Sequence, residues 1–350
     1  MSTFGSDTKL IKEIAWVLAQ ASATNQLDIP GEYIWTYPNK DFHDIRIRHT
    51  SIYNSGNSIK DKDIIDYTQT LNIAEYLKDP WISNKFEDYF THWLKQGKHY
   101  TLDNLDLFKY KGYSAGSQES FVHFFFTNRN KRFRLFKGEY WWHIDCWEAM
   151  KLNWAYIEDD DIRENDVCIL SYPFALNGDK HVQTDWLIEE CNKKNIELLL
   201  DFIYLPNSTN CVSIDLSADC IKQITFSLSK TFPAAQPAKL AIRMLKDKPH
   251  DIMQISNDEN ISNRLSTGLA LALCEKFSVN YIVDKYTNEQ THWCDRLKLQ
   301  KTKVVHFGMG DVYHNQPNAF SKFNIQHNRF NLGMLFENKN LLTKVKLYKD

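Results

Sequence analysis

The sequence predicts an α/β fold, with a large domain around a mostly parallel sheet flanked by helices, and a small α+β domain. The first observation is that short, unbroken apolar runs alternate with helical patterns through the middle of the chain. Strands that are covered on both faces give such runs, and their alternation with helices is typical of parallel sheets. The second is length, because 350 residues exceed the size at which a single core stops growing.

Helical and irregular segments precede the alternating region. Residues 8–22 place six apolar side chains at helical spacing, which predicts an amphipathic helix: Leu10, Ile11, Ile14, Ala15, Val17 and Leu18. Residues 25–70 are polar and are broken by prolines and glycines, so we expect an irregular arm with short strands. A second helix is predicted at 79–96, where four aromatic residues recur at helical spacing: Phe86, Tyr89, Phe90 and Trp93.

Six apolar runs in the middle of the chain are predicted strands. They are Arg132–Phe136, Trp154–Ile157, Val167–Tyr172, Ile196–Tyr204, Gln223–Ser229 and Leu240–Leu245. Helices are predicted between them, including Ser117–Phe126 and Val182–Lys194. Ligands of such sheets bind beyond the carboxyl ends of the strands. The polar residues at these strand ends are therefore the first candidates for a functional site.

The segment after Asp247 returns to a helical pattern. Two helices and then a small α+β cap are predicted, at 265–280, 283–297, 304–331 and 338–347. We therefore divide the chain into three parts. Residues 1–70 are an N-terminal helix and arm that contribute to the small domain and to a dimer contact, and residues 71–248 are the large domain. Residues 249–350 supply its closing helices and a reduced C-terminal small domain.

Composition and charge exclude several classes of partner. With 42 basic and 44 acidic residues, the chain lacks the basic surface that nucleic acid or an anionic membrane would need. No stretch approaches the ~20 apolar residues of a membrane span, and the first residues do not resemble a signal peptide. Seven scattered cysteines without a C-x-x-C pair indicate neither a disulfide framework nor a zinc site. We therefore expect a cytoplasmic protein with reduced thiols and no metal.

A lysine and an aspartate close two of the predicted strands. Lys230 ends the run Ile224-Thr225-Phe226-Ser227-Leu228-Ser229-Lys230, and a partly desolvated lysine in that position can act as an imine-forming nucleophile. Asp201 follows three leucines, where an acid is either paired structurally or placed to hold a cationic group of a ligand. The spacing between the two residues fits neighbouring or near-neighbouring strands. Most lysines that follow a strand reach solvent, so the lysine alone is a weak signal.

A turn of small residues lies upstream, in Tyr113-Ser114-Ala115-Gly116-Ser117-Gln118-Glu119-Ser120. Between a strand and a helix, such a turn presents backbone N–H groups and the positive end of the helix dipole to an anion. The alternative is a plain helix N-cap, formed by Ser117 with Glu119 or Ser120. The position of the turn, before the aspartate and lysine motifs, favours the anion site.

The order Asp-x-x-Tyr and then Ser-x-x-Lys, each at the end of a strand, resembles the fold-type I enzymes that use pyridoxal 5′-phosphate (PLP), and among them the class I/II aminotransferase family. The resemblance covers about residues 70–340 and implies the PLP-dependent transferase fold, with a sheet of the seven-stranded type and the cofactor in the large domain. It implies that Asp201 pairs with the protonated pyridine nitrogen and that Tyr204 donates to the ring phenolate oxygen. Ser227 then binds the phosphate, and Lys230 holds the cofactor as a Schiff base.

Two further segments are similar to the family's pattern. The residues that resemble its phosphate-binding cup are Ala115, Gly116, Ser117 and Gln118. In Phe136-Lys137-Gly138-Glu139-Tyr140-Trp141-Trp142-His143, Gly138 stands in the place of a proline, and an aromatic residue two positions later stacks on the pyridine face. The resemblance therefore implies that Tyr140 is the stacking residue, with Trp141 as the alternative if the register differs by one.

Two positions depart from the family's pattern. The segment 171–178 resembles an Asn-Pro-x-Asn-Pro-Thr-Gly loop, but Ala175 stands where the ring-contacting asparagine belongs, and Asn177 comes two positions late. Lys239 occupies the place of a phosphate-binding arginine, and a lysine supplies charge but no bidentate fork. Arg243 is expected to point elsewhere. These departures affect the ring-oxygen hydrogen bond and the phosphate contact, and they leave room for an atypical reaction.

Two residues outside these strand ends complete the implied site. The segment His327-Asn328-Arg329-Phe330-Asn331-Leu332-Gly333-Met334 resembles the family's C-terminal Arg-x-Asn segment, which implies that Arg329 binds the substrate α-carboxylate; a surface arginine at a strand end is the alternative. In this family a tyrosine in the region of Tyr76 reaches across a dimer interface to the phosphate, although the glycine that usually follows is missing here. The resemblance thus implies a homodimer with shared active sites.

The function implied by the resemblance is that of an aminotransferase, which moves an amino group between an amino acid and a keto acid in a ping-pong cycle through Lys230. Arg329 favours this reaction because it suits a substrate whose α-carboxylate is retained. The same machinery serves β-lyases, decarboxylases and acyl-condensing enzymes, and fold does not decide among them. A non-catalytic protein of this fold is the other alternative, but it would need none of Lys230, Asp201 and Tyr204.

Overall fold

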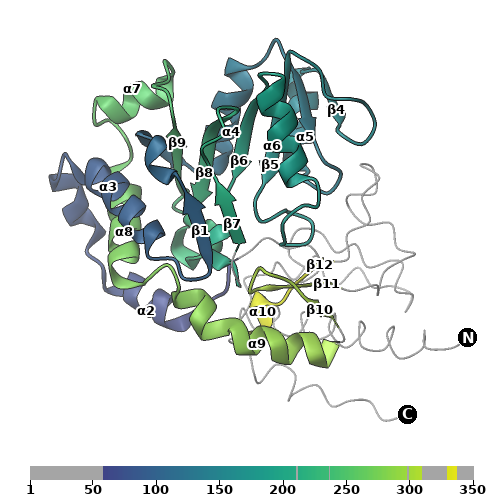
Figure 1. Cartoon of the computed structure of the whole chain (residues 1–350). Coiled ribbons are helices and arrows are strands. Elements are labelled where there is room, and N and C mark those ends of the chain that lie inside the picture. The colour runs from purple at the N-terminus through teal and green to yellow at the C-terminus, as the bar shows by residue number, and fades with distance from the viewer. Residues whose placement is uncertain (1–57, 210–211, 236, 298, 310–328, 337–350) are drawn as a thin grey trace, which may run out of the picture. The chain divides into compact units, whose positions relative to one another are not determined.

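The computed structural model describes residues 58–209, 212–235, 237–297, 299–309 and 329–336 (Figure 1). The predicted helix at 8–22, residues 25–57 of the predicted arm and the segment 338–347 of the predicted cap lie outside these residues. Within the described part of the chain, no helix is both long and apolar enough to cross a bilayer.

Helix α2 (Lys62–Thr70) stands where the end of the irregular arm was predicted, so the prediction was wrong for these residues. Asp61 caps the helix, because its carboxylate accepts the N–H of Ile64 at 2.8 Å. The same carboxylate accepts a hydrogen bond from Lys285 at 2.6 Å, in helix α9 (Tyr281–Leu297). This long-range contact stabilises a helix whose own sequence buries only Ile64.

Seven strands form the central sheet in the order β2-β9-β8-β6-β5-β3-β4 (Figure 1). Their bounds are β2 Tyr110–Ala115, β3 Arg132–Leu135, β4 Trp154–Tyr156, β5 Asp166–Ser171, β6 Glu197–Asp201, β8 Ile221–Ser227 and β9 Leu240–Leu245. Strand β9 is antiparallel to both of its neighbours, and the other pairs are parallel. Every residue of β5 is buried, as expected for a strand covered on both faces. The predicted fold class and the six predicted strands are confirmed.

Helices flank the sheet. Four of them lie at predicted helical patterns: α3 Ile82–Lys95, α4 Ser117–Thr127, α6 Thr184–Lys193 and α8 Arg264–Lys276. Two others, α5 Trp142–Met150 and α7 Ile252–Asp258, were not predicted. Helix α3 packs against α8, and its predicted aromatic stripe is buried at Phe86, Phe90 and Trp93. The indole N–H of Trp93 donates to the carbonyl of Phe277 at 2.8 Å, so the buried ring keeps its hydrogen bond.

The described residues group into two compact units, and α9 contributes to both. The larger unit comprises residues 61–287 and 303–305, with the central sheet and a parallel pair of β1 (Tyr100–Asp103) and β7 (Val212–Asp215). The smaller unit contains antiparallel strands and a short helix: β10 Gln300–Lys301, β11 Phe307–Met309, β12 Arg329–Asn331 and α10 Gly333–Phe336. The predicted domain boundaries at residues 70 and 248 stay predictions.

The register of the sheet brings several chain segments to one edge. Ser171, the last residue of β5, pairs with Asp201, the last of β6, which in turn pairs with Thr225 of β8. Because β9 runs the other way, its first residue, Leu240, pairs with Ala115 at the end of β2. The segments after β2, β3, β5, β6 and β8 and the segment before β9 therefore meet at the same edge. We term it the carboxyl edge, and it is where sheets of this kind bind ligands.

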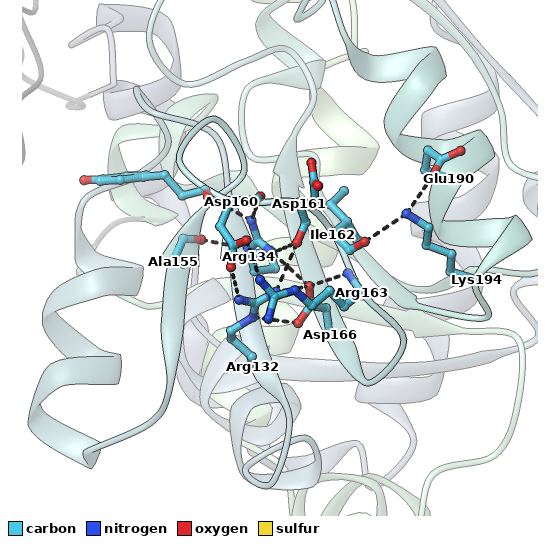
Figure 2. Close-up of polar contacts among 11 residues, drawn as sticks. Arg132, Arg134, Ala155, Asp160, Asp161, Ile162, Arg163, Asp166, Glu190 and Lys194 are labelled. Carbon is cyan, nitrogen blue, oxygen red and sulfur yellow. Dashed lines mark hydrogen bonds and ion pairs between the residues drawn. The ribbon is translucent and has the colours of Figure 1, made fainter.

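A buried arginine ties strands β3, β4 and β5 together (Figure 2). The guanidinium of Arg134 is fully buried and pairs with the carboxylate of Asp166 at 2.9 Å. It also donates to the backbone carbonyls of Ala155, Tyr156, Asp160 and Asp161. Arg132 pairs with the same Asp166 carboxylate at 2.8 Å. The buried charge is stable because each of its five N–H donors is directed to an oxygen.

Replacing Asp166 with asparagine should lower the free energy of unfolding by about 3–5 kcal/mol, because it leaves a buried charge uncompensated. Burial alone would raise the pKa of Asp166, but its hydrogen bonds from Arg132 and Arg134 hold that pKa below its usual value. The stabilisation is complete above the unfolded pKa of about 3.9 and is lost as pH falls through the folded pKa. Denaturant titrations from neutral to acid pH measure both effects. The control Asp66→Asn, in an exposed ion pair, should change little, and equal losses in the two variants would contradict this role.

Candidate functional site

The turn between β2 and α4 has the form expected of an anion-binding turn. Gly116 adopts a φ of +86°, in the left-handed region that favours glycine, and α4 begins at the next residue, Ser117. The alternative to an anion site was a plain N-cap that includes Glu119. The carboxylate of Glu119 does accept a hydrogen bond, but from the N–H of Ala115, which precedes the helix, at 2.6 Å. The first N–H groups of a helix have no partner within it. Those of Ser117 and Gln118 lie where the helix dipole favours an anion.

A lysine side chain lies beside this turn. Lys239 precedes β9, and a Cβ built on Gly116 would lie 3.5 Å from its Cδ. The backbone of Lys239 adopts a φ of +54°, and its carbonyl accepts a hydrogen bond from the hydroxyl of Tyr113 at 3.3 Å. The structure therefore brings a positively charged side chain next to the predicted anion turn.

Lys230 and Asp201 come together at the carboxyl edge. Lys230 ends a 3-10 turn, η6 (Leu228–Lys230), that follows β8, and it is half-buried. Asp201 is 3% exposed, and its carboxylate accepts the N–H of Ile203 at 2.9 Å. Burial raises the pKa of Asp201 well above its usual value, and the charge of Lys230 acts in the opposite direction. An acid so poorly solvated is stabilised as its anion by a neighbouring cation.

Asn207 holds the backbone around Lys230. It lies in another 3-10 turn, η5 (Leu205–Asn207), which follows Tyr204, and its side chain is fully buried. The side-chain amide donates to the carbonyl of Lys230 at 2.7 Å, and the amide oxygen accepts the hydroxyl of Thr231 at 3.0 Å. The segments that carry Tyr204 and Lys230 are thereby fixed to each other.

Tyr140 connects the anion turn with the buried acid. It follows β3, and its hydroxyl accepts a hydrogen bond from the amide of Gln118 at 3.4 Å. The pKa of Tyr140 is raised to about 12, chiefly by burial. The nearby Tyr204 is the next largest cause, and the charge of Asp201 adds to the shift. Its ring lies against Trp142, with the two planes 16° apart. The predicted ring-stacking tyrosine is thus near both Gln118 and Asp201.

Ala175 has no side-chain donor, and its backbone N–H is already bound within the loop. It is buried, and its N–H donates to the Ser171 hydroxyl oxygen at 2.8 Å. The amide oxygen of Asn177 accepts the N–H of Asp179 at 3.0 Å, a hydrogen bond within its own turn. The loop that resembles the asparagine-containing segment of the family is therefore held by the end of β5.

A buried acid that the sequence did not reveal lies beside this loop. Glu139 is almost fully buried and accepts the N–H and the hydroxyl of Ser171, each at 2.6 Å. Burial raises the pKa of Glu139 to about 7, and the charge of Glu139 in turn raises the pKa of Asp201. Asn207 was missed as well, because a lone asparagine after a proline is typical of any turn. The signal for Glu139 was its place next to Tyr140, within a predicted binding segment.

Two other predicted residues have partners of their own. Ser227 caps the turn that ends at Lys230, since its Oγ accepts the N–H of Ser229 at 3.1 Å and lies 2.7 Å from the Ser229 Oγ. Tyr76 packs its ring on Gly268 of α8, where an added Cβ would lie 2.2 Å from the Tyr76 Cγ. The phosphate contact of Ser227 and the interface role of Tyr76 stay predictions.

Two arginines named from the sequence lie in different settings. Arg243 forms hydrogen bonds of 2.5 and 3.0 Å with the carboxylate of Asp251 in the larger unit, and so points away from the anion turn as expected. Arg329 belongs to the smaller unit, where it begins β12 and its guanidinium lies 4.3 Å from the centre of the Phe307 ring. The role of Arg329 toward a substrate stays a prediction.

Comparison with known proteins shows the fold. No protein-family model and no curated protein matches the sequence. A putative aminotransferase from Silicibacter pomeroyi has a similar structure, with a TM-score of 0.60 and 13% identity over 95% of this chain and 97% of that one. For the PLP-bound C–S lyase from Staphylococcus hominis the TM-score is 0.54 and the identity is 15%, and the match covers 76% of this chain and 82% of that one. For a probable N-succinyldiaminopimelate aminotransferase from Thermus thermophilus the TM-score is 0.54 and the identity is 14%, and the match covers 84% of this chain and 93% of that one.

The likeness agrees with the architecture derived above. All three proteins resemble this chain over most of its length, although few residues are identical. The mostly parallel seven-stranded sheet, flanked by helices, is the arrangement that the sequence motifs implied. The chain therefore has the fold of the PLP-dependent transferases of fold type I.

Proposed function

We propose that this protein is a PLP-dependent enzyme that transfers an amino group between an amino acid and a keto acid. One observation carries the proposal: the half-buried Lys230 and the buried Asp201 act on each other at the edge where the sheet also presents the Gly116 turn. An amine, a buried acid and an anion turn match the aldehyde, ring nitrogen and phosphate of this cofactor. The C–S lyase of similar fold is described as bound to PLP.

The donor set at the carboxyl edge fits the cofactor. Lys230 would hold the aldehyde carbon through its ε-amine, and Asp201 the protonated ring nitrogen. Tyr140 would lie on the ring face and Tyr204 would donate to the ring oxygen, whereas Ala175 supplies no side-chain donor there. The phosphate would be held by Ala115, Gly116, Ser117, Gln118, Ser227 and Lys239. The raised pKa of Asp201 supports this assignment, because its anion forms readily only when a cation lies beside it.

The side chains of the site would divide the work of holding and moving protons. When bound, the cofactor supplies an electron sink for the bond that is broken at the substrate Cα. Asp201 keeps the proton on the ring nitrogen. Lys230 would act as the acid–base group of the site, because its amine can accept the proton that leaves the substrate Cα and later return it. Each half of the cycle moves one amino group, so we expect ping-pong kinetics.

A β-lyase is the second candidate. It is favoured by the loss of the usual asparagine at Ala175 and by the C–S lyase of similar fold. Transamination is favoured by Arg329, whose predicted contact with the α-carboxylate suits a product that retains this group. The small-molecule substrates are accordingly an amino acid and a keto acid.

Lys230→Ala should abolish covalent attachment of the cofactor. Purified wild type incubated with PLP should show a visible absorption band that borohydride bleaches, leaving a mass increase on Lys230. The variant should show neither, because it lacks the amine. Lys222→Ala is the matched control, since Lys222 lies on the same strand and reaches solvent. A colourless wild type, or a band that survives in Lys230→Ala, contradicts the proposal.

The amount of keto acid formed identifies the reaction type when an amino acid is added without a keto-acid acceptor. A transaminase should release about one keto acid per active site and then stop, because without an acceptor the amino group stays on the enzyme. A β-lyase should continue to turn over and should release ammonia with each keto acid. Sustained ammonia release would exclude transamination as the main reaction.

We further propose that the protein is a cytoplasmic homodimer with shared active sites. Four large apolar side chains are exposed on the larger unit: Leu77, Trp81, Ile261 and Leu265. They are close in space, because Arg264 donates to the carbonyl of Leu77 at 3.1 Å and the hydroxyls of Ser83 and Ser262 lie 2.5 Å apart. Contiguous exposed apolar surface is typical of protein interfaces. Tyr76, next to Leu77, would complete the active site of the second copy.

The cytoplasmic location is supported by the cysteines, because those in the described residues form no disulfides.

Trp81→Glu should weaken this dimer by about 2 kcal/mol or more, because tryptophan is among the residues whose loss costs most at interfaces, and the variant would bring a charge to an apolar surface. Analytical ultracentrifugation across a concentration series measures the dissociation constant. Val182→Glu is the control, since Val182 is an exposed apolar residue before α6 and outside the patch. It should sediment like the wild type, and a wild type that is monomeric at high concentration would contradict the dimer.

A further inference from the structure

Glu139 is a buried carboxyl that the proposed mechanism does not use. It lies in the turn between β3 and α5 at the carboxyl edge, next to Tyr140, and is 2% exposed. A carboxylate is destabilised by burial unless hydrogen bonds or a cation replace the lost water. The position of Glu139 therefore requires an explanation from its contacts.

Glu139 holds two loops of the site together. Its Oε1 accepts the N–H of Ser171 and its Oε2 accepts the Ser171 hydroxyl, both at 2.6 Å, while the N–H of Tyr140 donates to Oε2 at 3.2 Å. The Ser171 oxygen in turn accepts the N–H of Ala175 at 2.8 Å. One carboxylate thus links the turn that carries Tyr140 with the loop that carries Ala175, at the last residue of β5.

The same carboxylate adds negative charge next to Asp201. Ser171 pairs with Asp201 in the register of β5 and β6, so Glu139 binds the residue directly beside Asp201. The pKa of Asp201 is raised by its burial and further by the charge on Glu139, while Lys230 lowers it. The pKa of Glu139 itself is raised to about 7 by burial, against the hydrogen bonds from Ser171.

Of the described residues whose charges act on these two carboxyls, only Lys230 is cationic. Tyr140, in the segment after β3, lies near both Asp201 and Tyr204, which is in the segment after β6. Tyrosine side chains carry no charge at neutral pH, so neither adds a cation. Two acids and one amine leave this part of the edge complementary to a further positive group.

We propose that Glu139 is a positioning residue of the cofactor site, which fixes the Tyr140 turn and the Ala175 loop and places a second carboxyl beside Asp201 to favour a protonated ring nitrogen. This inference rests on the proposed function. It gives the buried acid a part in a site where Ala175 supplies no side-chain hydrogen bond. A purely structural tie would need the hydrogen bonds of Glu139 but not its charge.

Two variants separate charge from hydrogen bonding. Glu139→Gln keeps the shape and removes the charge, and with PLP bound the pH at which the visible band is half lost should fall by about one unit, a tenfold change in proton affinity. Ser171→Ala keeps the carboxyl but removes one of its hydrogen bonds and the bridge to Ala175, so it should weaken cofactor binding several-fold and move the midpoint much less than Glu139→Gln does. The control Glu158→Gln should change neither, because Glu158 also accepts a backbone N–H, that of Lys137, but is exposed.

A second readout needs no cofactor. The raised pKa means that the Glu139 carboxyl stabilises the folded chain fully below its ordinary value of 4.5, and that this stabilisation is lost as pH rises through about 7. In cofactor-free protein, the denaturant midpoint of the wild type should therefore fall relative to that of Glu139→Gln across this interval. Glu158→Gln should follow the wild type.

The two proposals fail in different ways. A wild type without a visible band overturns the proposed function, and the cofactor-free titration then shows whether Glu139 is still the buried, perturbed acid described here. A normal band whose midpoint is unmoved in Glu139→Gln overturns the role of Glu139 alone. An equal shift in Ser171→Ala also overturns it, because geometry would then be the cause. A shift that is clearly larger in Glu139→Gln than in Ser171→Ala supports the inference.

Discussion

The pairing of β5, β6 and β8 is the constraint on which the candidate site depends. Ser171, Asp201 and Thr225 form one row across the sheet, and Lys230 follows a few residues after the end of that row. A slip of one residue would turn Asp201 to the other face of the sheet and away from the lysine. The slip is prevented by the core, because all of β5 and nearly all of β6 are buried and can pack in only one register. The geometry of the edge is therefore set by apolar packing.

Buried charge is handled in two opposite ways in the larger unit. In the Arg134 network each donor has an acceptor, and the pKa of Asp166 is lowered. At the carboxyl edge Asp201 and Glu139 have their pKa values raised, since burial outweighs the hydrogen bonds they receive. The first arrangement stabilises the fold without a ligand. The second is destabilised as it stands and gains most from a cationic partner, which is the usual mark of a functional site.

Much of the sheet could be predicted from the sequence, because strands covered on both faces leave apolar runs, and the nearness of Lys230 and Asp201 followed from where two such runs end. Helix α2 could not be predicted, since its cap depends on Lys285, more than two hundred residues away. Glu139 was missed because a glutamate in a turn is ordinarily solvated, and its burial arises only when β5 folds beside it. The part assigned to Arg329 comes from the resemblance alone, since it lies in the smaller unit.

The Arg134 network also bears on how the chain meets other chains. In the described sheet β4 is a terminal strand, only three residues long. Terminal strands expose backbone groups that can recruit a strand from another molecule and begin aggregation. Here the carbonyls of Ala155 and Tyr156 already accept hydrogen bonds from Arg134, and the loop that follows is bound to the same guanidinium. The buried arginine thereby makes this border of the sheet a poor template for intermolecular β-pairing.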